Sequence, residues 1–214
     1  AEILSQFRVL TQISSVGKME AFKAFAGQII EHEKLVVFCW YKDTIRKIKE
    51  MFPNVLTIYG DNTQDEIDKA KKLFQTEDKY RIIVLSYKKG STGHNLQVAS
   101  KMIKLELSWT AAMEDQAEDR CYRIGTKDTV NIYYLLGRDT IDDHRYSIID
   151  AKRQAGKEVT GSKGVIETNM IDDLTKLIIR NNSRSDNAEV PEYEVLKPKA
   201  LNHVNIKSEN LQLF

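Results

Sequence analysis

Five apolar runs constrain the fold of this chain more than any other feature of its sequence. Each run is almost continuously apolar instead of alternating with polar residues, so each predicts a strand that is buried on both faces. The segments between the runs carry apolar residues at helical spacing. Alternating buried strands and helices are typical of an α/β fold, in which helices cover both faces of a parallel sheet. The predicted strands are residues 35–40, 55–59, 81–86, 102–107 and 130–136.

Capping and stop signals place the helices between these strands. The residue before a proline disfavours the helical conformation, so the helix over 43–52 stops before Pro53. Asn62 or Thr63 is a suitable N-cap for the next helix, and Glu66 completes a capping box if Thr63 is the cap. The predicted helices are residues 18–31, 43–52, 64–75, 111–122, 139–155 and 170–180.

This pattern divides the chain into four stretches. Residues 1–17 are a lead-in segment with no clear structural pattern, and residues 18–138 hold the alternating strands and helices. Residues 139–180 form two further helices after the last predicted strand. The composition then becomes polar, and we interpret residues 181–214 as a flexible tail or linker.

Composition argues against several classes of protein. A hydrophobic fraction of 42% and a charged fraction of 29% describe an ordinary globular domain. The net charge of +1 argues against a protein that coats polyanions, so nucleic acid must meet a local patch. Cys39 and Cys121 form no CxxC pair and the histidines lack ligand spacing, so we expect neither a disulfide framework nor a metal site. This cysteine usage predicts a reducing, intracellular compartment. No apolar run is long enough to cross a bilayer, so we expect no membrane.

The loops that follow the predicted strands are the places to look for chemistry. Four of them begin at Trp40, Tyr59, Ser86 and Ser108, and the carboxyl ends of parallel strands meet at one edge of a sheet. Ligands of such sheets bind outside that edge. Trp40 and Trp109 both lie there, and an aromatic ring in that position either stacks on a base or sugar or packs at the rim of the core.

One helix carries a group of side chains suited to phosphate. Gln116, Arg120 and Arg123 are spaced i, i+4 and i+7, so the helix presents all three on one face. A guanidinium is always charged, and its planar fork of donors suits phosphate oxygens. The same spacing is compatible with a solvated helix in which Glu118 and Asp119 pair with the arginines.

The loop over residues 86–96 is a second candidate for phosphate. Gly90 and Gly93 permit close approach of the backbone to a ligand, Ser86 offers a hydroxyl, and Lys88 supplies positive charge. Such a loop suits the phosphate of DNA or of a nucleotide. A helix-capping turn with exposed lysines has the same composition, so the loop alone does not decide between the two.

Two other motifs are rejected. Gly17 and Lys18 resemble the end of a phosphate-binding loop, but the motif needs a glycine at Gln12 and a Ser or Thr at Met19. The IDDH run at 141–144 resembles an acidic metal box, yet it follows a turn and lies in the first turn of a predicted helix, where acids favour the helix dipole. The chain therefore has arginines for phosphate but no cradle for a triphosphate or its magnesium.

The motifs occur in a characteristic order: FCWY (38–41), YGDNTQDE (59–66), VLSYKKGSTGHNLQ (84–97), Trp109, QAEDRCYRIGT (116–126), VNIYYLL (130–136) and TIDD (140–143). In that order they resemble the second RecA-like lobe of Swi/Snf-type helicase-like ATPases, closest to the fork-remodelling, annealing-helicase branch. The resemblance covers about residues 18–180. It implies a P-loop NTPase-like lobe over 18–138 with bracing helices over 139–180. The asparagine–proline pair that the family has after the tryptophan is replaced here by Thr110 and Ala111.

The resemblance also implies roles for individual residues. Gln116, Arg120 and Arg123 would belong to the last helicase motif, with the arginines reaching the γ-phosphate of ATP on the first lobe. Gly93 and Asn95 would couple the nucleotide state to the grip on DNA. The residues that would line the DNA backbone are Trp40, Lys42, Thr63, Ser86, Lys88 and Trp109.

The resulting hypothesis is the C-terminal lobe of an ATP-driven double-stranded-DNA translocase. ATP and Mg²⁺ would be held mainly by an N-terminal RecA-like lobe of the same polypeptide, so we expect this chain alone to be inactive. We expect it in the cytoplasm of a bacterial or phage-infected cell, or in a eukaryotic nucleus. The alternatives are the second lobe of an RNA helicase and a non-enzymatic nucleic-acid-binding module. A dinucleotide-binding domain is more distant, because no GxGxxG follows a strand.

Overall fold

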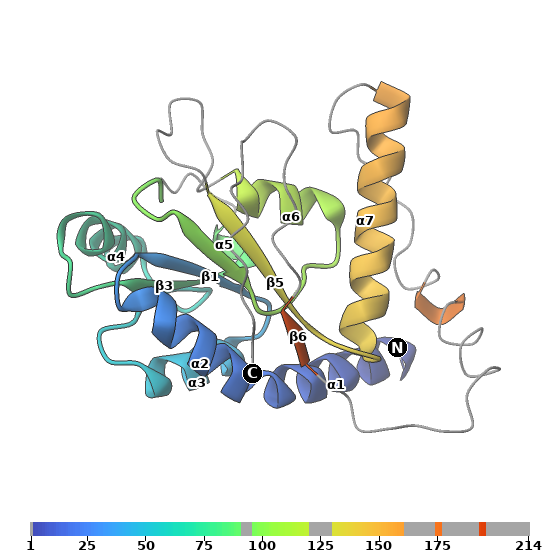
Figure 1. Cartoon of the computed structure of the whole chain (residues 1–214), viewed down its shortest axis with the longest axis horizontal. Coiled ribbons are helices and arrows are strands. Elements are labelled where there is room, and N and C mark those ends of the chain that lie inside the picture. Colours follow the sequence, from blue (N-terminus) through green and yellow to red (C-terminus); the bar gives the residue numbers. More distant parts are fainter. Residues whose placement is uncertain (1, 91–95, 120–129, 161–173, 177–192, 196–214) are drawn as a thin grey trace.

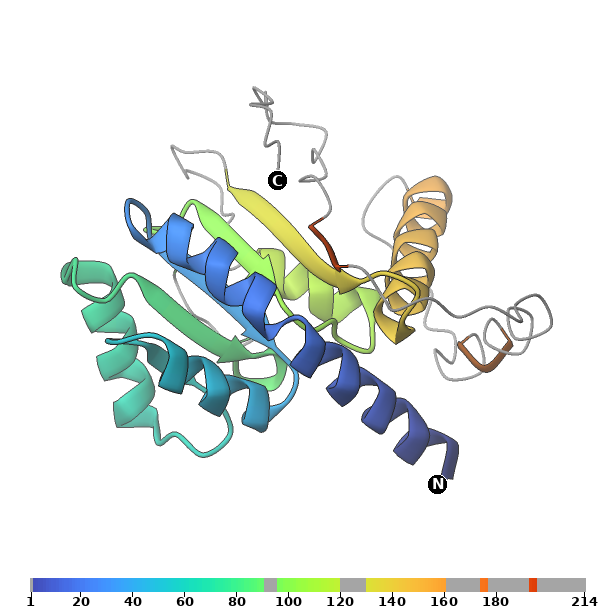
Figure 2. The ribbon, with the colours of Figure 1, turned by 60° about the horizontal axis from the view of Figure 1, so that its bottom comes forward.

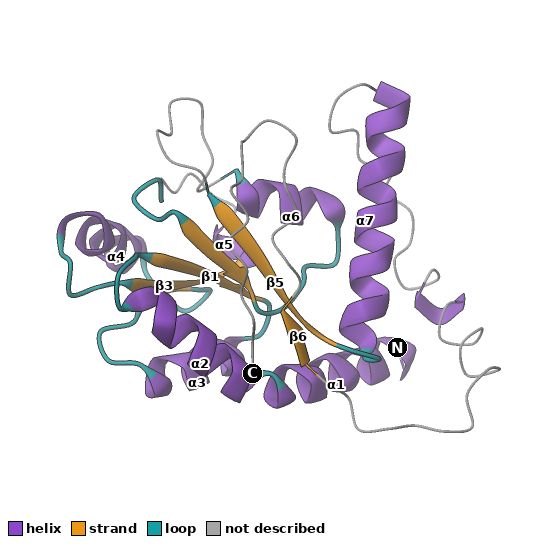
Figure 3. Cartoon of the chain, viewed as in Figure 1, coloured by secondary structure: helices purple, strands orange, loops and turns teal. Residues whose placement is uncertain are grey.

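The computed structural model of the chain describes residues 2–90, 96–119, 130–160, 174–176 and 193–195 (Figure 1). These residues form a sheet with helices packed against it (Figure 3). The helices are α1 (Glu2–Gly17), α2 (Met19–Ile30), α3 (Lys42–Met51), α4 (Gln64–Thr76), α5 (Tyr87–Gly90), α6 (Ala111–Glu118) and α7 (Ile141–Thr160). The strands are β1 (Leu35–Cys39), β2 (Leu56–Ile58), β3 (Ile82–Ser86), β4 (Lys101–Lys104), β5 (Asn131–Gly137) and β6 (Tyr193–Val195).

The sheet has the strand order β2-β3-β1-β4-β5-β6. β1 lies at its centre, where Val37 pairs with Val84 of β3 on one side and with Ile103 of β4 on the other. The pairs among β1 to β5 are all parallel, and β6 is antiparallel to β5. The predicted parallel sheet of an α/β fold is therefore confirmed.

Two apolar layers cover the two faces of the sheet, because the side chains of each strand alternate between them. Along β1, Val36 and Phe38 join the layer that α4, α6 and α7 cover. Leu35, Val37 and Cys39 join the layer that α2 and α3 cover. Figure 2 shows α2 and α3 on one side of the sheet and α6 and α7 on the other. Helices on both faces explain why the five strands read as continuous apolar runs.

Several predicted boundaries hold. The helix over 43–52 is α3, which ends at Met51, two residues before Pro53. Thr63 is the N-cap of α4 and forms the capping box with Glu66: its hydroxyl accepts from the Glu66 N–H at 3.3 Å, and the Glu66 carboxylate accepts from the Thr63 N–H at 2.8 Å. Thr110, which replaces the family's asparagine, is the N-cap of α6 and accepts from the Met113 N–H.

The lead-in segment, for which we made no structural assignment from the sequence, forms the helix α1 over Glu2–Gly17. Its pattern is inverted relative to an ordinary amphipathic helix. Thr11 and Ser14 are buried, whereas Ile13 is 63% exposed. The buried hydroxyls contact α7, since Ser14 donates to Asp142 at 2.7 Å and Thr11 accepts from Arg145 at 3.4 Å. A helix that buries hydroxyls and exposes aliphatic side chains gives no clean apolar periodicity in the sequence.

Three expectations are corrected by the structure. β4 ends at Lys104 instead of residue 107, and α7 continues to Thr160 past residue 155. The stretch 181–214 was expected to lack structure, yet β6 lies within it and pairs with β5. Of the helix predicted over 170–180, the structure describes residues 174–176, which are helical. The remainder of that helix and of the tail lies outside the described residues.

Candidate functional site

The parallel sheet brings the predicted DNA-contact residues to its carboxyl edge. Trp40 follows β1 and Lys42 begins α3, while Ser86 ends β3 and Lys88 lies in α5. Thr63 follows β2, and Trp109 lies between β4 and α6. These six residues therefore come from the ends of four neighbouring strands and surround one edge.

The two tryptophans of this edge are in contact. The ring centroids of Trp40 and Trp109 lie 6.5 Å apart, and that of Tyr87 lies 6.1 Å from Trp40. Trp40 and Trp109 are half-buried and pack against the core, whereas Tyr87 is buried. Packing at the rim of the core, one of the two roles considered for these residues, is thus present for both tryptophans, and both residues remain partly exposed.

Two of the polar candidates at the edge, Lys42 and Thr63, already have partners within the chain. The Lys42 ammonium forms an ion pair with Asp61, and both side chains are half-exposed. The Thr63 hydroxyl serves the capping box of α4. Ser86 is only 9% exposed, so little of it faces solvent. Of these three, Lys42 is the side chain best placed to reach a phosphate in solvent.

The predicted phosphate-facing residues are only partly described. Gln116 lies on the exposed side of α6. Gly93, Asn95, Arg120 and Arg123 lie outside the described residues, and so does Cys121. Glu118, which the solvated-helix alternative paired with the arginines, is buried instead and faces Lys104 and Arg153.

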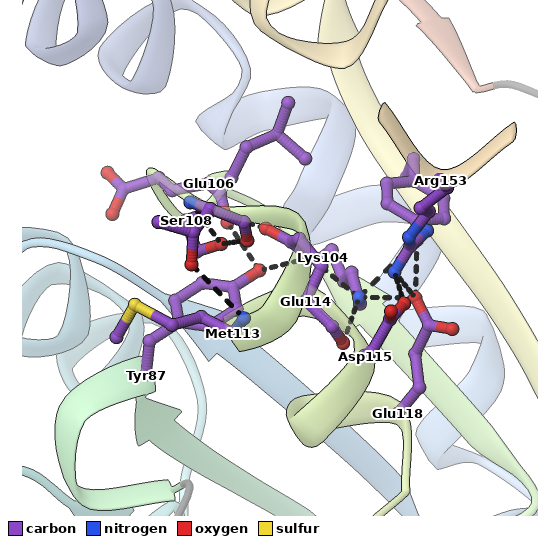
Figure 4. Close-up of polar contacts among 12 residues, drawn as sticks. Tyr87, Lys104, Glu106, Ser108, Met113, Glu114, Asp115, Glu118 and Arg153 are labelled. Carbon is purple, nitrogen blue, oxygen red and sulfur yellow. Dashed lines mark hydrogen bonds and ion pairs between the residues drawn. The ribbon is translucent and has the colours of Figure 1, made fainter. Parts of the chain in front are cut away.

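A buried polar cluster, which we call the Lys104 cluster, holds α6 against the sheet (Figure 4). It consists of Lys104, Glu114, Glu118, Tyr134 and Arg153. The Lys104 ammonium lies 2.6 Å from the carboxylates of both Glu114 and Glu118. The Tyr134 hydroxyl donates to Glu118 at 2.6 Å, and Arg153 of α7 donates to the same carboxylate at 2.7 Å. The cluster therefore joins β4, β5, α6 and α7.

The charges of the cluster control the protonation of its members. Burial by itself would raise the pKa of Glu118, but the positive charges of Lys104 and Arg153 outweigh it and lower that pKa to about 2. Burial would lower the pKa of Lys104, yet the neighbouring carboxylates of Glu114 and Glu118 raise it. Both partners therefore stay ionised at neutral pH, as a buried ion pair requires.

Glu118→Gln is expected to flatten the acid dependence of stability. The folded-state pKa of Glu118, about 2, lies below its ordinary value of 4.5, so its contribution to stability is full above pH 4.5 and is lost as the pH falls toward 2. That contribution is about 3 kcal/mol. Urea unfolding between pH 2 and pH 7 measures it. The exposed Glu50, replaced by Gln, is the matched control, and an acid limb equally steep in both variants would contradict the assignment.

A second buried carboxylate shapes the Trp40 loop. Glu106 is fully buried, and its carboxylate accepts from the N–H groups of Trp40 at 2.7 Å and Tyr41 at 2.8 Å. It also accepts from the Thr44 hydroxyl at 2.6 Å. A carboxylate at the N-terminus of a helix satisfies unpaired donors and favours the helix dipole. Glu106 therefore fixes the start of α3, where Lys42 lies.

The sequence interpretation missed these buried charges, although a signal was present. Lys104 and Glu106 are charged residues inside the apolar run 102–107, and charged residues are almost never fully buried unless paired. Lys18, rejected as a phosphate-loop lysine, is likewise buried and lies 2.5 Å from Asp142 of the IDDH run. Asp142 lies in the first turn of α7, which confirms the prediction that this run starts a helix.

The described part of the chain holds neither a metal-binding cluster nor a membrane-spanning helix. Within residues 2–90, 96–119, 130–160 and the two short segments beyond them, no three His, Cys, Asp or Glu side chains cluster so as to hold a metal ion. No helix in the same part of the chain is both long and apolar enough to span a membrane.

The topology and the strand-end loops define an α/β lobe of the RecA-like type. The profile of the helicase conserved C-terminal domain family matches residues 17–125, and the chain belongs to this family. The chain is similar to the C-terminal part of the Fun30 ATPase domain, with a TM-score of 0.64 and 24% identity over 78% of this chain and 54% of that one. It is also similar to the Sulfolobus solfataricus SWI2/SNF2 ATPase core, with a TM-score of 0.55 and 29% identity over 69% and 31% of the two chains.

Curated relatives point to the same branch. A SWI/SNF-related matrix-associated actin-dependent regulator of chromatin subfamily A-like protein 1 from Xenopus tropicalis is 31% identical over 64% of this chain and 14% of its own length. An uncharacterized ATP-dependent helicase from Mycoplasma pneumoniae is 28% identical over 76% of this chain and 16% of its own length. DNA repair protein RAD5 from Debaryomyces hansenii is 30% identical over 60% of this chain and 12% of its own length. The Swi/Snf-type resemblance is confirmed, and the chain spans less than a fifth of these relatives.

Proposed function

We propose that this chain is the second lobe of an ATP-dependent double-stranded-DNA translocase. Gln116, Arg120 and Arg123 act on ATP that is held, with Mg²⁺, by an N-terminal RecA-like lobe of the same polypeptide. Trp40, Lys42, Thr63, Ser86, Lys88 and Trp109 grip the DNA backbone. Opening and closing of the cleft between the lobes moves the pair along one strand. Membership of the helicase C-terminal family and the names of the relatives, an ATP-dependent helicase and a DNA repair protein, support this proposal.

The observation that carries the proposal is the continuity of the β4–α6 segment. At the carboxyl edge this segment holds Trp109, close to Trp40. It then continues directly into α6, whose exposed side carries Gln116. A segment that serves both a DNA-facing edge and a phosphate-facing helix suits a motor, in which nucleotide state must control the grip on DNA. Two buried contacts support this segment: the Glu106 carboxylate accepts from the Trp40 N–H, and the Lys104 ammonium donates to Glu114 and Glu118 of α6.

This chain alone is expected not to hydrolyse ATP, because it offers arginines for the γ-phosphate but no phosphate cradle. Lys18, the lysine that follows a glycine at the start of the domain, is fully buried against Asp142 and cannot reach a nucleotide. Phosphate release by the purified chain, with and without duplex DNA, tests this expectation. Turnover by the wild-type chain that Arg120→Ala abolishes would refute it.

Two alternatives make different predictions. The second lobe of an RNA helicase would respond to RNA instead of duplex DNA, so stimulation of the full-length protein by each nucleic acid distinguishes the two. A non-enzymatic binding module predicts that no lobe with a phosphate loop is encoded together with this chain. Reading the gene upstream of Ala1 tests that prediction directly.

A further inference from the structure

The helix α7 reaches the β4–α6 segment with two arginines, Arg145 and Arg153. They are eight residues apart, which corresponds to about 12 Å along an α-helix. Arg145 meets the loop between β4 and α6, whereas Arg153 meets α6 itself. α7 thus contacts the segment at two separate places, one next to the DNA-facing edge and one on the phosphate-facing helix.

Arg145 holds the loop that carries Trp109. Its side chain is fully buried, and its Nη2 donates to the carbonyl oxygens of Leu107 at 2.5 Å and Ser108 at 2.8 Å. The guanidinium lies 4.4 Å from the centroid of the Trp109 ring, which is a cation–π geometry. Its Nη1 donates to Thr11 of α1 at 3.4 Å. One side chain therefore fixes both the backbone of the loop and the plane of the tryptophan.

Arg153 holds α6 by a different set of contacts. Its Nη2 lies 2.6 Å from the Asp115 carboxylate and 2.7 Å from that of Glu118 (Figure 4). Its Nη1 donates to the Tyr134 hydroxyl at 2.8 Å. Asp115 immediately precedes Gln116, so the guanidinium fixes the rotation of the turn from which Gln116 projects into solvent. Charge-assisted bonds of this kind give geometric specificity as well as energy.

We propose that Arg145 and Arg153 are positioning residues with separate functions. Arg145 presents Trp109 to DNA, and Arg153 orients α6, which carries Gln116, toward ATP. α7 is then the element that fixes the DNA-facing loop and the phosphate-facing helix relative to each other. This inference rests on the proposed function, and it assigns roles to residues that neither ligand touches.

The test compares Arg145→Met and Arg153→Met in the full-length protein. Two constants are measured: kcat for ATP at saturating duplex DNA, and the DNA concentration that gives half-maximal stimulation. Arg145→Met is expected to raise the half-maximal DNA concentration about tenfold with kcat nearly unchanged. Arg153→Met is expected to lower kcat about tenfold with little change in the DNA requirement. Arg153→Lys keeps the ion pair with Glu118 and is expected to recover part of the lost kcat.

Arg81→Met is the matched control, since Arg81 also donates to backbone carbonyls, at 3.2 Å to Asp78 and 3.4 Å to Ile30, but lies before β3 at the opposite edge. It should leave both constants unchanged. If a methionine variant fails to fold, Arg145→Lys and Asp115→Asn remove only part of each contact and should show the same separation. The inference alone is overturned if either variant changes kcat and the half-maximal DNA concentration in proportion. It is also overturned if neither variant changes either constant. A wild-type protein without DNA-stimulated turnover overturns the proposed function and the inference together.

Discussion

Replacing Arg123 by alanine in the full-length protein is expected to lower DNA-stimulated ATP turnover by about a hundredfold or more. An arginine that reaches the γ-phosphate neutralises the charge that develops as the phosphoryl group is transferred, and it does so mainly in the transition state. The loss should therefore appear in kcat, with a smaller change in KM for ATP. Arg123→Lys should recover little, because an ammonium lacks the planar fork of donors.

The control for this substitution is Arg8→Ala, which removes an exposed arginine of α1. It should leave kcat unchanged. Steady-state turnover at saturating duplex DNA measures all three variants, and circular dichroism establishes that each is folded. A kcat of Arg123→Ala within a few-fold of wild type would remove Arg123 from the catalytic assignment, whatever the DNA dependence of the enzyme.

Lys104→Met is expected to cost about 3–5 kcal/mol of unfolding free energy, because it leaves buried carboxylates without their cation. Lys104, Glu114 and Glu118 are at most 7% exposed at the side chain, so water cannot replace the lost partner. Glu118 keeps Arg153, whereas Glu114 loses its ion-pair partner among the described residues. The double variant Lys104→Met/Glu114→Gln removes the stranded charge as well and should recover part of the loss.

Urea unfolding at pH 7 measures the unfolding free energy of both Lys104 variants and of wild type. An equal slope of free energy against urea concentration in all three means that the difference in midpoint reports stability. An exposed lysine, Lys79, gives the matched control as Lys79→Met. A loss of unfolding free energy below about 1 kcal/mol for Lys104→Met would contradict the role given to the Lys104 cluster. So would a double variant in which the loss from Glu114→Gln simply adds to the loss from Lys104→Met.

The sheet was predictable because its strands are buried on both faces. A strand such as β1, with five buried residues in succession, leaves a continuous apolar run that no exposed helix produces. The capping box of α4 was predictable for a different reason, since Thr63 and Glu66 satisfy the helix start by local contacts alone. Local rules therefore sufficed wherever local contacts determine the structure.

The sequence was less informative where a distant partner determines the structure. α1 buries Ser14 and Thr11 only because Asp142 and Arg145 of α7, more than 120 residues away, supply polar partners. β6 forms because β5 offers it an edge, which composition cannot show. The candidate site follows the same division: the strand ends that carry Trp40 and Trp109 were predictable, whereas the contacts of Arg145 and Arg153 were not.

The most direct test of the central claim is ATP turnover by the full-length protein, measured without nucleic acid, with duplex DNA and with RNA. We expect a low basal rate that duplex DNA raises several-fold or more and RNA does not, with no turnover by residues 1–214 alone. A rate that duplex DNA leaves unchanged in a correctly folded protein would contradict the motor assignment. Stimulation by RNA in place of DNA would assign this lobe to an RNA helicase.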